Sequence, residues 1–255
     1  METLAAVEAV TEALGLTRGG VRAADISLKG ERDVVTTVDV AVEQALRARL
    51  ADVLGLPSIG EEHGGSPPTD GSGYWLIDPI CGTRNFASGT PLYSINLALV
   101  EAGEVTIAVV GDPSRDEILV AERGRGAWAL ADGARDPLAV NDSSGIVIVE
   151  DGRSNGRRRG QAASFVERLI RADRWDFRSL GTTLSLPYLA AGRVSAYVVF
   201  CVTAVHSAAG ALLATEAGSS LSDIDGAPWT LESDTLLACA SARVHDDLLA
   251  LADTP

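Results

Sequence analysis

The chain has 255 residues, which is enough for one large domain or two small ones. Its 35 acidic and 21 basic residues give a formal net charge of -14, so its surface repels nucleic acid and anionic lipid, and neither is expected as a partner. Three widely spaced cysteines argue against a disulfide scaffold, and without a membrane-length apolar segment or a secretory pattern we expect a cytoplasmic protein.

Helices and strands in the first half of the chain follow from the spacing of apolar residues. Helical spacing predicts two helices, over 3–16 and 38–54. Residues 57–62 are expected to form a short strand ending in a polar loop, 63–73 a loop rich in Gly, Pro, Ser and Thr, and 74–78 a buried strand that ends on a carboxylate. Four more strands, separated by short glycine-bearing turns, predict an antiparallel meander and cover 93–100, 105–111, 117–122 and 127–130.

Strands and helices alternate in the second half of the chain. The predicted strands cover 145–149, 195–202 and 236–240. The predicted helices cover 161–172, 182–191, 205–217 and 243–252. This alternation is typical of a layered α/β structure, which is the fold class that we expect.

The most specific motif is the run from Trp75 to Phe86, WLIDPICGTRNF. Gly-Glu-Glu stands before it at 60–62, and Val-His-Ser-Ala-Ala-Gly stands after it at 205–210. These patterns resemble those of the inositol monophosphatase superfamily, which read Gly-Glu-Glu, Trp-x-Ile-Asp-Pro-Ile-Asp-Gly-Thr-x-Asn-Phe and Trp-Asp-x-Ala-Ala-Gly. The resemblance covers nearly the whole chain, because it also includes 33–36 with Asp39, 124–128 and 178–182.

The resemblance implies a five-layered αβαβα sandwich, usually homodimeric, with its site between two sheets. It implies one compact catalytic unit made of an α+β half, residues 1–142, which carries the metal and phosphate motif, and an α/β half, residues 143–255. The implied activity is metal-dependent hydrolysis of a small phosphorylated substrate. That reaction needs cations to neutralise charge on the transferring phosphoryl oxygens.

The family pattern also assigns roles to residues of this chain. It implies one divalent cation, Mg²⁺ with Mn²⁺ or Zn²⁺ as alternatives, bound by Glu61, Asp78 and the carbonyl of Ile80. It implies that two side chains orient and deprotonate the attacking water, namely Glu62 and Thr83. It implies a phosphate-binding cradle at a helix start and a neighbouring loop, formed by Gly82, Thr83, Gly181 and Thr182.

Two carboxylates of the family pattern are replaced in this chain. Cys81 stands where the second Asp of the long motif is expected, and His206 stands where the Asp of Trp-Asp is expected. In the family those two carboxylates hold a second metal ion, so a second Mg²⁺ is not expected here. Val199 takes the place of a Glu that contacts substrate hydroxyls in several members, and valine cannot form those hydrogen bonds. Strict inositol recognition is therefore not expected.

Three functions are compatible with these changes. The favoured one is a diverged enzyme acting on a small phosphorylated or polyol-like metabolite, with chemistry centred on Cys81 and His206. The pair could form a thiolate nucleophile, favoured by the imidazole and nearby N–H groups and opposed by Asp78, or it could bind Zn²⁺ together with Asp78 and Glu61. The alternatives are a Mg²⁺-dependent phosphomonoesterase for inositol, sugar or nucleotide phosphates that works with a reduced metal site, and a non-catalytic ligand-binding relative.

The remaining reactive side chains receive structural interpretations. Cys201 and Cys239 fall in predicted strands and are expected to be buried, whereas His63 is expected in a solvated loop and His245 at the surface of the last helix. A basic cluster either attracts an anionic substrate or is a solvated loop, and it consists of Arg153, Arg157, Arg158 and Arg159. The Ala- and Arg-rich composition is typical of a high-GC source, in which diverged paralogues often serve specialised metabolism.

Overall fold

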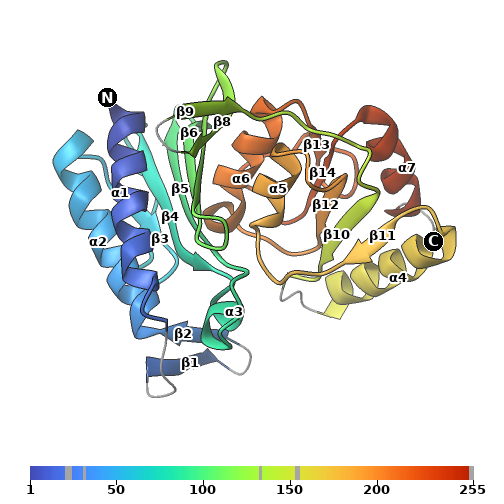
Figure 1. The fold of residues 1–255 in the computed structure, drawn as a ribbon, viewed down its shortest axis with the longest axis horizontal. Coiled ribbons are helices and arrows are strands. Elements are labelled where there is room, and N and C mark those ends of the chain that lie inside the picture. Colours follow the sequence, from blue (N-terminus) through green and yellow to red (C-terminus); the bar gives the residue numbers. More distant parts are fainter. Residues whose placement is uncertain (21–24, 31–32, 132–133, 153–155, 253–255) are drawn as a thin grey trace.

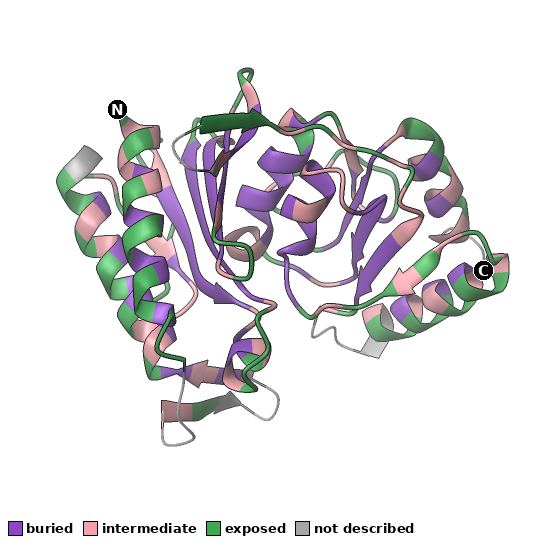
Figure 2. Ribbon diagram, in the orientation of Figure 1, coloured by how far each residue is buried: buried purple, intermediate pink, exposed green. Residues whose placement is uncertain are grey.

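The computed structural model describes residues 1–20, 25–30, 33–131, 134–152 and 156–252. Its elements form five layers, in which helices cover both outer faces and fill the space between two sheets (Figure 1). Apolar side chains are buried where these layers meet (Figure 2). The arrangement confirms the predicted αβαβα sandwich.

The larger sheet contains the predicted antiparallel meander. Its seven strands lie in sequence order and are β3 (Ser58–Gly60), β4 (Tyr74–Cys81), β5 (Ser94–Glu101), β6 (Glu104–Asp112), β7 (Glu117–Glu122), β8 (Gly126–Ala131) and β9 (Ala134–Pro137). Only the β3–β4 pair is parallel among these strands. Strand β9, which the sequence does not predict, is a short edge strand whose four residues are all exposed, so it lacks a hydrophobic pattern.

Two helices cover the outer face of this sheet, α1 (Glu2–Thr17) and α2 (Thr37–Leu54). Val10 and Leu14 of α1 belong to the same hydrophobic core as Trp75 of β4. A Cβ added to Gly111 of β6 would lie 2.9 Å from Val10 Cγ1, so glycine allows the helix to approach the sheet closely. This packing fixes one face of β4, the strand in which the long motif begins.

A short hairpin precedes α2 and sets the start of that helix. Its strands are β1 (Ile26–Gly30) and β2 (Asp33–Thr36), which the sequence does not predict. The Thr36 hydroxyl accepts hydrogen bonds from the N–H groups of Val38 and Asp39, while the Asp39 carboxylate accepts one from the N–H of Thr36. This capping box holds the Asp39 side chain at the first turn of α2.

The middle layer consists of α5 (Ser185–Ala190) and α6 (Ala204–Glu216). Helix α6 is apolar nearly all round because it lies between the two sheets: Ala209 and Leu213 pack on the larger sheet, and Ala211 packs on the smaller one. A Cβ on Gly210 would lie 2.6 Å from Leu186 Cβ, so the two helices touch at a glycine. The first turn of α6, which carries His206, is thereby fixed between the sheets.

The smaller sheet has the strand order β11-β10-β12-β14-β13. Its strands are β10 (Ile146–Glu150), β11 (Asp176–Arg178), β12 (Ala196–Val199), β13 (Ser220–Ser222) and β14 (Leu236–Cys239). Helices α4 (Gly156–Ala172) and α7 (Ala242–Ala252) cover its outer face. Strand β10 runs parallel to both of its neighbours and ends at Glu150.

Several predicted boundaries change in the structure. The helix predicted over 182–191 is shorter, because residues 182–184 form a turn before α5, and the strand predicted over 195–202 ends at Val199. The predicted division between residues 142 and 143 falls between β9 and β10, and as a domain boundary it stays a prediction. In the described part of the chain, no helix is long and apolar enough to cross a membrane.

Candidate functional site

A pocket of about 290 Å³ opens between the two sheets, at the end of β4 and beside the first turn of α6. Most residues of the predicted site line it, namely Glu61, Ile80, Cys81, Gly82, Thr83, Gly181, Thr182 and His206. Asp78 lies directly behind this wall and is fully buried. Glu62 is outside the lining, so its predicted role in orienting water stays a prediction.

The irregular end of β4 turns two side chains into the same place. Strand β4 pairs regularly with β5 up to Asp78 opposite Asn96, and pairing resumes only at Cys81 opposite Ser94. Pro79 has no N–H to donate, which suits a break in the ladder. Residues three apart would face opposite sides of a regular strand, and the break allows Asp78 and Cys81 to approach one another.

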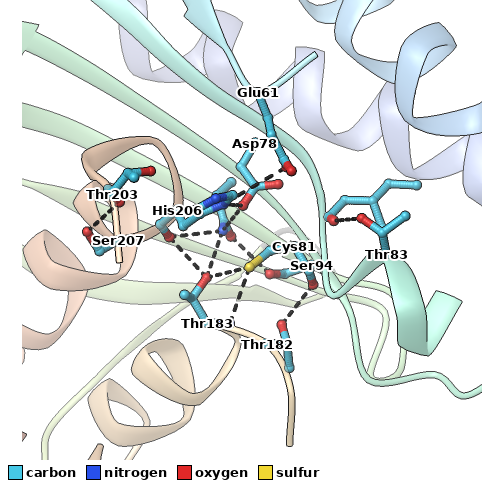
Figure 3. Close-up of polar contacts among 12 residues, drawn as sticks. Glu61, Asp78, Cys81, Thr83, Ser94, Thr182, Thr183, Thr203, His206 and Ser207 are labelled. Carbon is cyan, nitrogen blue, oxygen red and sulfur yellow. Dashed lines mark hydrogen bonds and ion pairs between the residues drawn. The ribbon is translucent and has the colours of Figure 1, made fainter. Parts of the chain in front are cut away.

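His206 reaches Asp78 from the other side of the pocket (Figure 3). Its Nδ1 lies 2.8 Å from Asp78 Oδ2 and 4.0 Å from Glu61 Oε2. Asn96 Nδ2 lies 3.5 Å from the same Asp78 oxygen. The other oxygen, Asp78 Oδ1, is buried without a hydrogen-bond partner among the described residues. A buried carboxylate oxygen without a donor is costly unless a cation completes it.

The carboxylate of Asp78 controls the charge of His206. Burial, the largest single influence, lowers the pKa of His206, but the charge and hydrogen bond of Asp78 and the contact with Cys81 together raise this pKa well above its ordinary value. The contact with Asp78 therefore favours the protonated imidazole, at a position where the family pattern has a carboxylate.

The thiol of Cys81 is buried among hydroxyl and amide groups. Its Sγ lies 2.8 Å from Thr183 Oγ1 and accepts a hydrogen bond from the N–H of Thr183 at 3.3 Å. Burial and the charge of Asp78 raise the pKa of Cys81, and they outweigh the hydrogen bonds from His206 and Thr183. His206 thus favours the thiolate and Asp78 opposes it, as expected, but burial decides the net direction of the pKa, and spacing in the sequence does not reveal desolvation.

Thr83 begins α3 (Thr83–Ala87), the short helix that follows β4. Its hydroxyl lies 3.1 Å from Asp39 Oδ1 and 3.1 Å from the carbonyl oxygen of Ile80. Burial raises the pKa of Asp39. Gly82 has φ 105°, and a Cβ there would lie 2.9 Å from the carbonyl oxygen of Leu92, so the turn into α3 requires glycine.

The Gly60–Glu62 turn is fastened to α2 by Glu43, which the sequence analysis does not single out. The buried Glu43 carboxylate accepts hydrogen bonds from the N–H of Glu62 at 2.7 Å and from the N–H of His63 at 3.2 Å. It also pairs with Arg47 Nε at 2.8 Å. A Cβ on Gly60 would overlap the Glu43 carboxylate, so a larger residue at this position would displace the anchor.

This anchor also changes the interpretation of His63. Its Nδ1 lies 3.1 Å from Glu43 Oε1 and its Nε2 lies 3.5 Å from Gln44 Nε2. His63 was expected in a solvated loop, and its side chain is 38% exposed, but the ring is tied to α2. It belongs to the support of the turn that carries Glu61.

A second support lies across the pocket, at the end of β10. Glu150 accepts hydrogen bonds from Ser179 Oγ at 2.8 Å, the N–H of Leu180 at 2.6 Å and the N–H of Gly181 at 2.8 Å. Burial raises the pKa of Glu150. Thr182 Oγ1 donates to the carbonyl of Cys81 at 2.8 Å. The N–H of Gly181 and the hydroxyl of Thr182 thus already have hydrogen-bond partners within the protein. The predicted role of these two residues in phosphate binding is supported only by their position in the pocket wall.

Other predicted residues lie in varied surroundings. Val199 lines the pocket, and so does the half-buried Cys201, whereas Cys239 is fully buried as expected. His245 was expected at the surface, but its side chain is only 15% exposed and its Nε2 lies 2.8 Å from Ser222 Oγ. The interpretation of His245 as a surface residue is therefore wrong.

The basic cluster is divided by its partners. Arg158 pairs with Asp234 at 2.7 Å, and Arg159 lies 3.6 Å from Asp151. Both arginines are thus matched by carboxylates, but they lie in the first turn of α4, so the interpretation of this part of the cluster as a loop is wrong. Arg153 and the side chain of Arg157 lie outside the described residues.

The donors of the pocket fit one hard cation. Glu61, Asp78 and the Ile80 carbonyl offer oxygen ligands, and Asp78 Oδ1 has no hydrogen-bond partner among the residues that the structure describes. The replaced positions do not fit a second hard cation, because Cys81 and His206 offer sulfur and nitrogen. The two halves of the expected metal site therefore differ in chemistry.

Comparison with known proteins gives consistent results over the whole chain. A family model described as "Inositol monophosphatase family" matches residues 2–254. The chain is 33% identical to an inositol-1-monophosphatase of Rhizobium meliloti over 93% of this chain and 89% of that protein. It is 35% identical to the Nus factor SuhB of Pasteurella multocida over 87% and 84% of the two chains.

Solved structures share the same architecture. An IMPase of Thermotoga maritima superposes with a TM-score of 0.82 and 28% identity, covering 97% of this chain and 94% of that one. The extragenic suppressor protein suhB of Bartonella henselae superposes with a TM-score of 0.88 and covers 99% and 98% of the two chains. At 24% identity, the latter match concerns the fold alone.

Proposed function

The chain belongs to the inositol monophosphatase family, and on this premise we propose that it is a divalent-cation-dependent hydrolase of a small phosphorylated metabolite, with altered chemistry at Cys81 and His206. One observation carries the proposal. The pocket keeps the oxygen donors Glu61 and Asp78 while the two replaced residues lie against Asp78. The expected ligands of the first ion are therefore retained, whereas the two residues expected to hold the second ion are replaced.

A single cation position is part of this proposal. Glu61, Asp78 and the Ile80 carbonyl would hold the ion, and this assignment is supported by Asp78 Oδ1, which has no hydrogen-bond partner in the described part of the chain. When bound, the ion supplies charge neutralisation at the phosphoryl oxygens. The anchoring of the Glu61 turn by Glu43 would keep its carboxylate in position without a contribution from the substrate.

Thr83 and Asp39 would accept the proton of the attacking water. A threonine hydroxyl has one proton and two lone pairs, so Thr83 Oγ1 can donate to Asp39 Oδ1 and accept a proton from water at the same time. A raised pKa brings the Asp39 carboxylate closer to the value that a general base needs at neutral pH. Glu62 would assist in orienting this water, as the family pattern implies.

The altered pair is expected to weaken the ordinary reaction. Replacing two carboxylates by Cys81 and His206 removes the hard donors that a second Mg²⁺ needs, and with them part of the stabilisation of the leaving oxygen. Val199 supports a substrate that presents an apolar rather than a hydroxylated face to this wall. We therefore infer a slow phosphomonoesterase on inositol monophosphates, with a different small ester as its preferred substrate.

Phosphate release from a panel of inositol, sugar and nucleotide monophosphates, with and without Mg²⁺ or Mn²⁺, tests the proposed function. We expect cation-dependent release from at least one ester, and its loss in Thr83→Ala. A rate of roughly 1–1000 per second on inositol monophosphates would indicate an ordinary family phosphatase. No release from any ester by folded protein would indicate a non-catalytic ligand-binding relative.

The assembly and setting also belong to the proposal. The resemblance implies a homodimer, and the composition is associated with specialised metabolism in the cytoplasm. Light scattering on the purified protein measures the assembly directly, with a mass of twice the chain expected. A monomeric mass at micromolar concentration would contradict the dimer without affecting the assignment of the pocket.

A further inference from the structure

Three different ligand types meet at the pocket wall. Asp78 offers a carboxylate oxygen, Cys81 a sulfur and His206 a ring nitrogen, and these atoms all lie within 4.8 Å of one another (Figure 3). They come from the end of β4 and the first turn of α6, both of which are fixed by packing between the sheets. The group therefore needs little rearrangement to surround one ion.

We propose that Asp78, Cys81 and His206 form a site for a thiophilic divalent cation of the Zn²⁺ class, in place of a second Mg²⁺. Thiolate and imidazole ligands favour Zn²⁺, whereas Mg²⁺ prefers oxygen ligands in a strict octahedral geometry. A set of three protein ligands that leaves one position open is the usual arrangement of catalytic zinc sites. The same sulfur and nitrogen ligands that do not suit Mg²⁺ therefore suit Zn²⁺.

Burial prepares the donors for an ion. Asp78 is fully buried, its Oδ1 has no hydrogen-bond partner among the described residues, and Cys81 is 6% exposed. Neither side chain has to be withdrawn from bulk water when the ion binds.

Thr183 is placed to support a metal-bound thiolate. Its hydroxyl lies 3.0 Å from Asn96 Nδ2, which donates to it, and 3.0 Å from the His206 carbonyl oxygen, to which it donates. With that proton in use, the Cys81 thiol donates to Thr183 Oγ1. Once the thiol proton is lost, the same hydroxyl can turn to donate to the sulfur, beside the N–H of Thr183 that already does so.

The charges of the loaded site balance. Binding displaces the thiol proton of Cys81 and the proton carried by His206, and both protons leave to solvent. One thiolate, one carboxylate and one neutral imidazole then face an ion of charge +2, so the two negative ligands neutralise the charge of the ion. Glu61 also lines the pocket, and its Oε2 lies 4.0 Å from His206 Nδ1.

The inference rests on the proposed function in one respect, because it assigns an occupant to the same pocket and shares Asp78 with the proposed Mg²⁺ position. It does not depend on turnover. A test that measures metal binding can therefore fail or succeed separately from the phosphate-release assay.

The test is a titration of the ion-free full chain with Co²⁺, a spectroscopic substitute for Zn²⁺. We expect a near-ultraviolet thiolate-to-cobalt charge-transfer absorption that saturates at one ion per chain. Added Zn²⁺ should abolish the absorption, and excess Mg²⁺ should leave it. Cys81→Ser should eliminate it, whereas Cys201→Ser, which changes another thiol of the same pocket, should retain it.

A second variant guards against misfolding of the first. Thr183→Val keeps the Cys81 ligand and removes only the supporting hydroxyl, so we expect the absorption to persist with affinity reduced roughly 10–100-fold. No charge-transfer absorption in the wild-type chain, or an absorption that survives in folded Cys81→Ser, overturns the inference. Absorption without phosphate release from any ester would leave the metal site in place and reject the proposed hydrolase instead.

Discussion

His206 Nδ1 lies 2.8 Å from Asp78 Oδ2, and this contact joins two segments that are 128 residues apart in the sequence. Asp78 ends a regular stretch of β4 in the larger sheet, and His206 stands in the first turn of α6 between the sheets. Because Asp78 is also a ligand of the proposed cation, the residue at position 206 determines what the carboxylate can bind. The two replaced metal-ligand positions, 81 and 206, therefore both lie beside Asp78.

Substitution of the first proposed ligand should remove cation binding. Glu61→Gln keeps the size of the side chain and removes its charge, so Mg²⁺ and Mn²⁺ should bind more weakly in calorimetric titrations of the ion-free protein. Glu12→Gln is a matched control, because Glu12 is an exposed carboxylate on the outer helix α1. Unchanged binding in Glu61→Gln would show that the ion binds elsewhere.

The support beneath Glu61 should matter almost as much as the ligand. In Glu43→Gln, one acceptor oxygen becomes a donor, so either the N–H of Glu62 or the pair with Arg47 loses its partner. We expect a loss of about 1–3 kcal/mol in the free energy of unfolding and weaker Mg²⁺ binding by the folded protein. Denaturant unfolding and calorimetry measure the two effects. Reduced stability with unchanged ion affinity would restrict Glu43 to a structural role.

Thiol reactivity should follow exposure rather than proximity to the imidazole. Cys201 is half-buried at the pocket wall, whereas Cys81 is buried and its pKa is raised by burial and by Asp78. Alkylation of the ion-free protein followed by peptide mapping should therefore label Cys201 before Cys81. Earlier labelling of Cys81 would restore the interpretation of this residue as a thiolate nucleophile.

Glu150 should give a pH-dependent contribution to stability. Burial raises its pKa above the ordinary value of 4.5, so the native protein binds this proton more tightly than the unfolded chain does. The stability supplied by Glu150 is then fully present below pH 4.5 and is lost as the pH rises through the native value.

A neutral replacement should remove this loss. Glu150→Gln can still accept from Leu180 and Gly181, and its amide can donate to the Ser179 hydroxyl. At pH 7 the variant should be more stable than the wild type by roughly 1.4 kcal/mol for each unit by which the pKa is raised. The difference should vanish at acidic pH in denaturant titrations. A variant that is less stable at pH 7 would mean that the hydrogen bonds of the charged form outweigh burial.

The sequence predicts the layers well and the short edges poorly. Long apolar patterns specify the meander and the helices, whereas β9 has four exposed residues and β11 and β13 have three residues each, which is too short for a recognisable period. The hairpin of β1 and β2 is missed for a similar reason. These elements depend on pairing with partners, which a linear pattern does not contain.

The motif predicts which residues share the pocket but not how they interact. Cys81 and His206 lie beside Asp78 as the resemblance implies, yet burial, which the motif does not reveal, is the largest influence on the pKa of Cys81 and raises it despite the favourable contact with His206. Thr183 contacts Cys81 from 102 residues away, next to a threonine that the motif did include. Glu43 stands in a helical pattern that looks like an ordinary amphipathic surface, so its burial under the Glu61 turn gave no signal.

Reversal of the altered pair is the most direct measurement of what separates this chain from ordinary members of its family. Cys81→Asp combined with His206→Asp returns two hard, anionic donors beside Asp78, so a second Mg²⁺ can bind. Either change alone leaves that ion under-coordinated and should have little effect, and the gain should therefore be strongly non-additive.

The readout is Mg²⁺-dependent phosphate release from several small esters by the wild type, both single variants and the double variant. We predict a large gain in the double variant only, together with loss of the cobalt charge-transfer absorption. Selectivity among esters should stay loose, because Val199 still offers no hydrogen bond to a substrate hydroxyl. A correctly folded double variant that gains no activity on any ester would contradict the central claim that Cys81 and His206 carry the divergence.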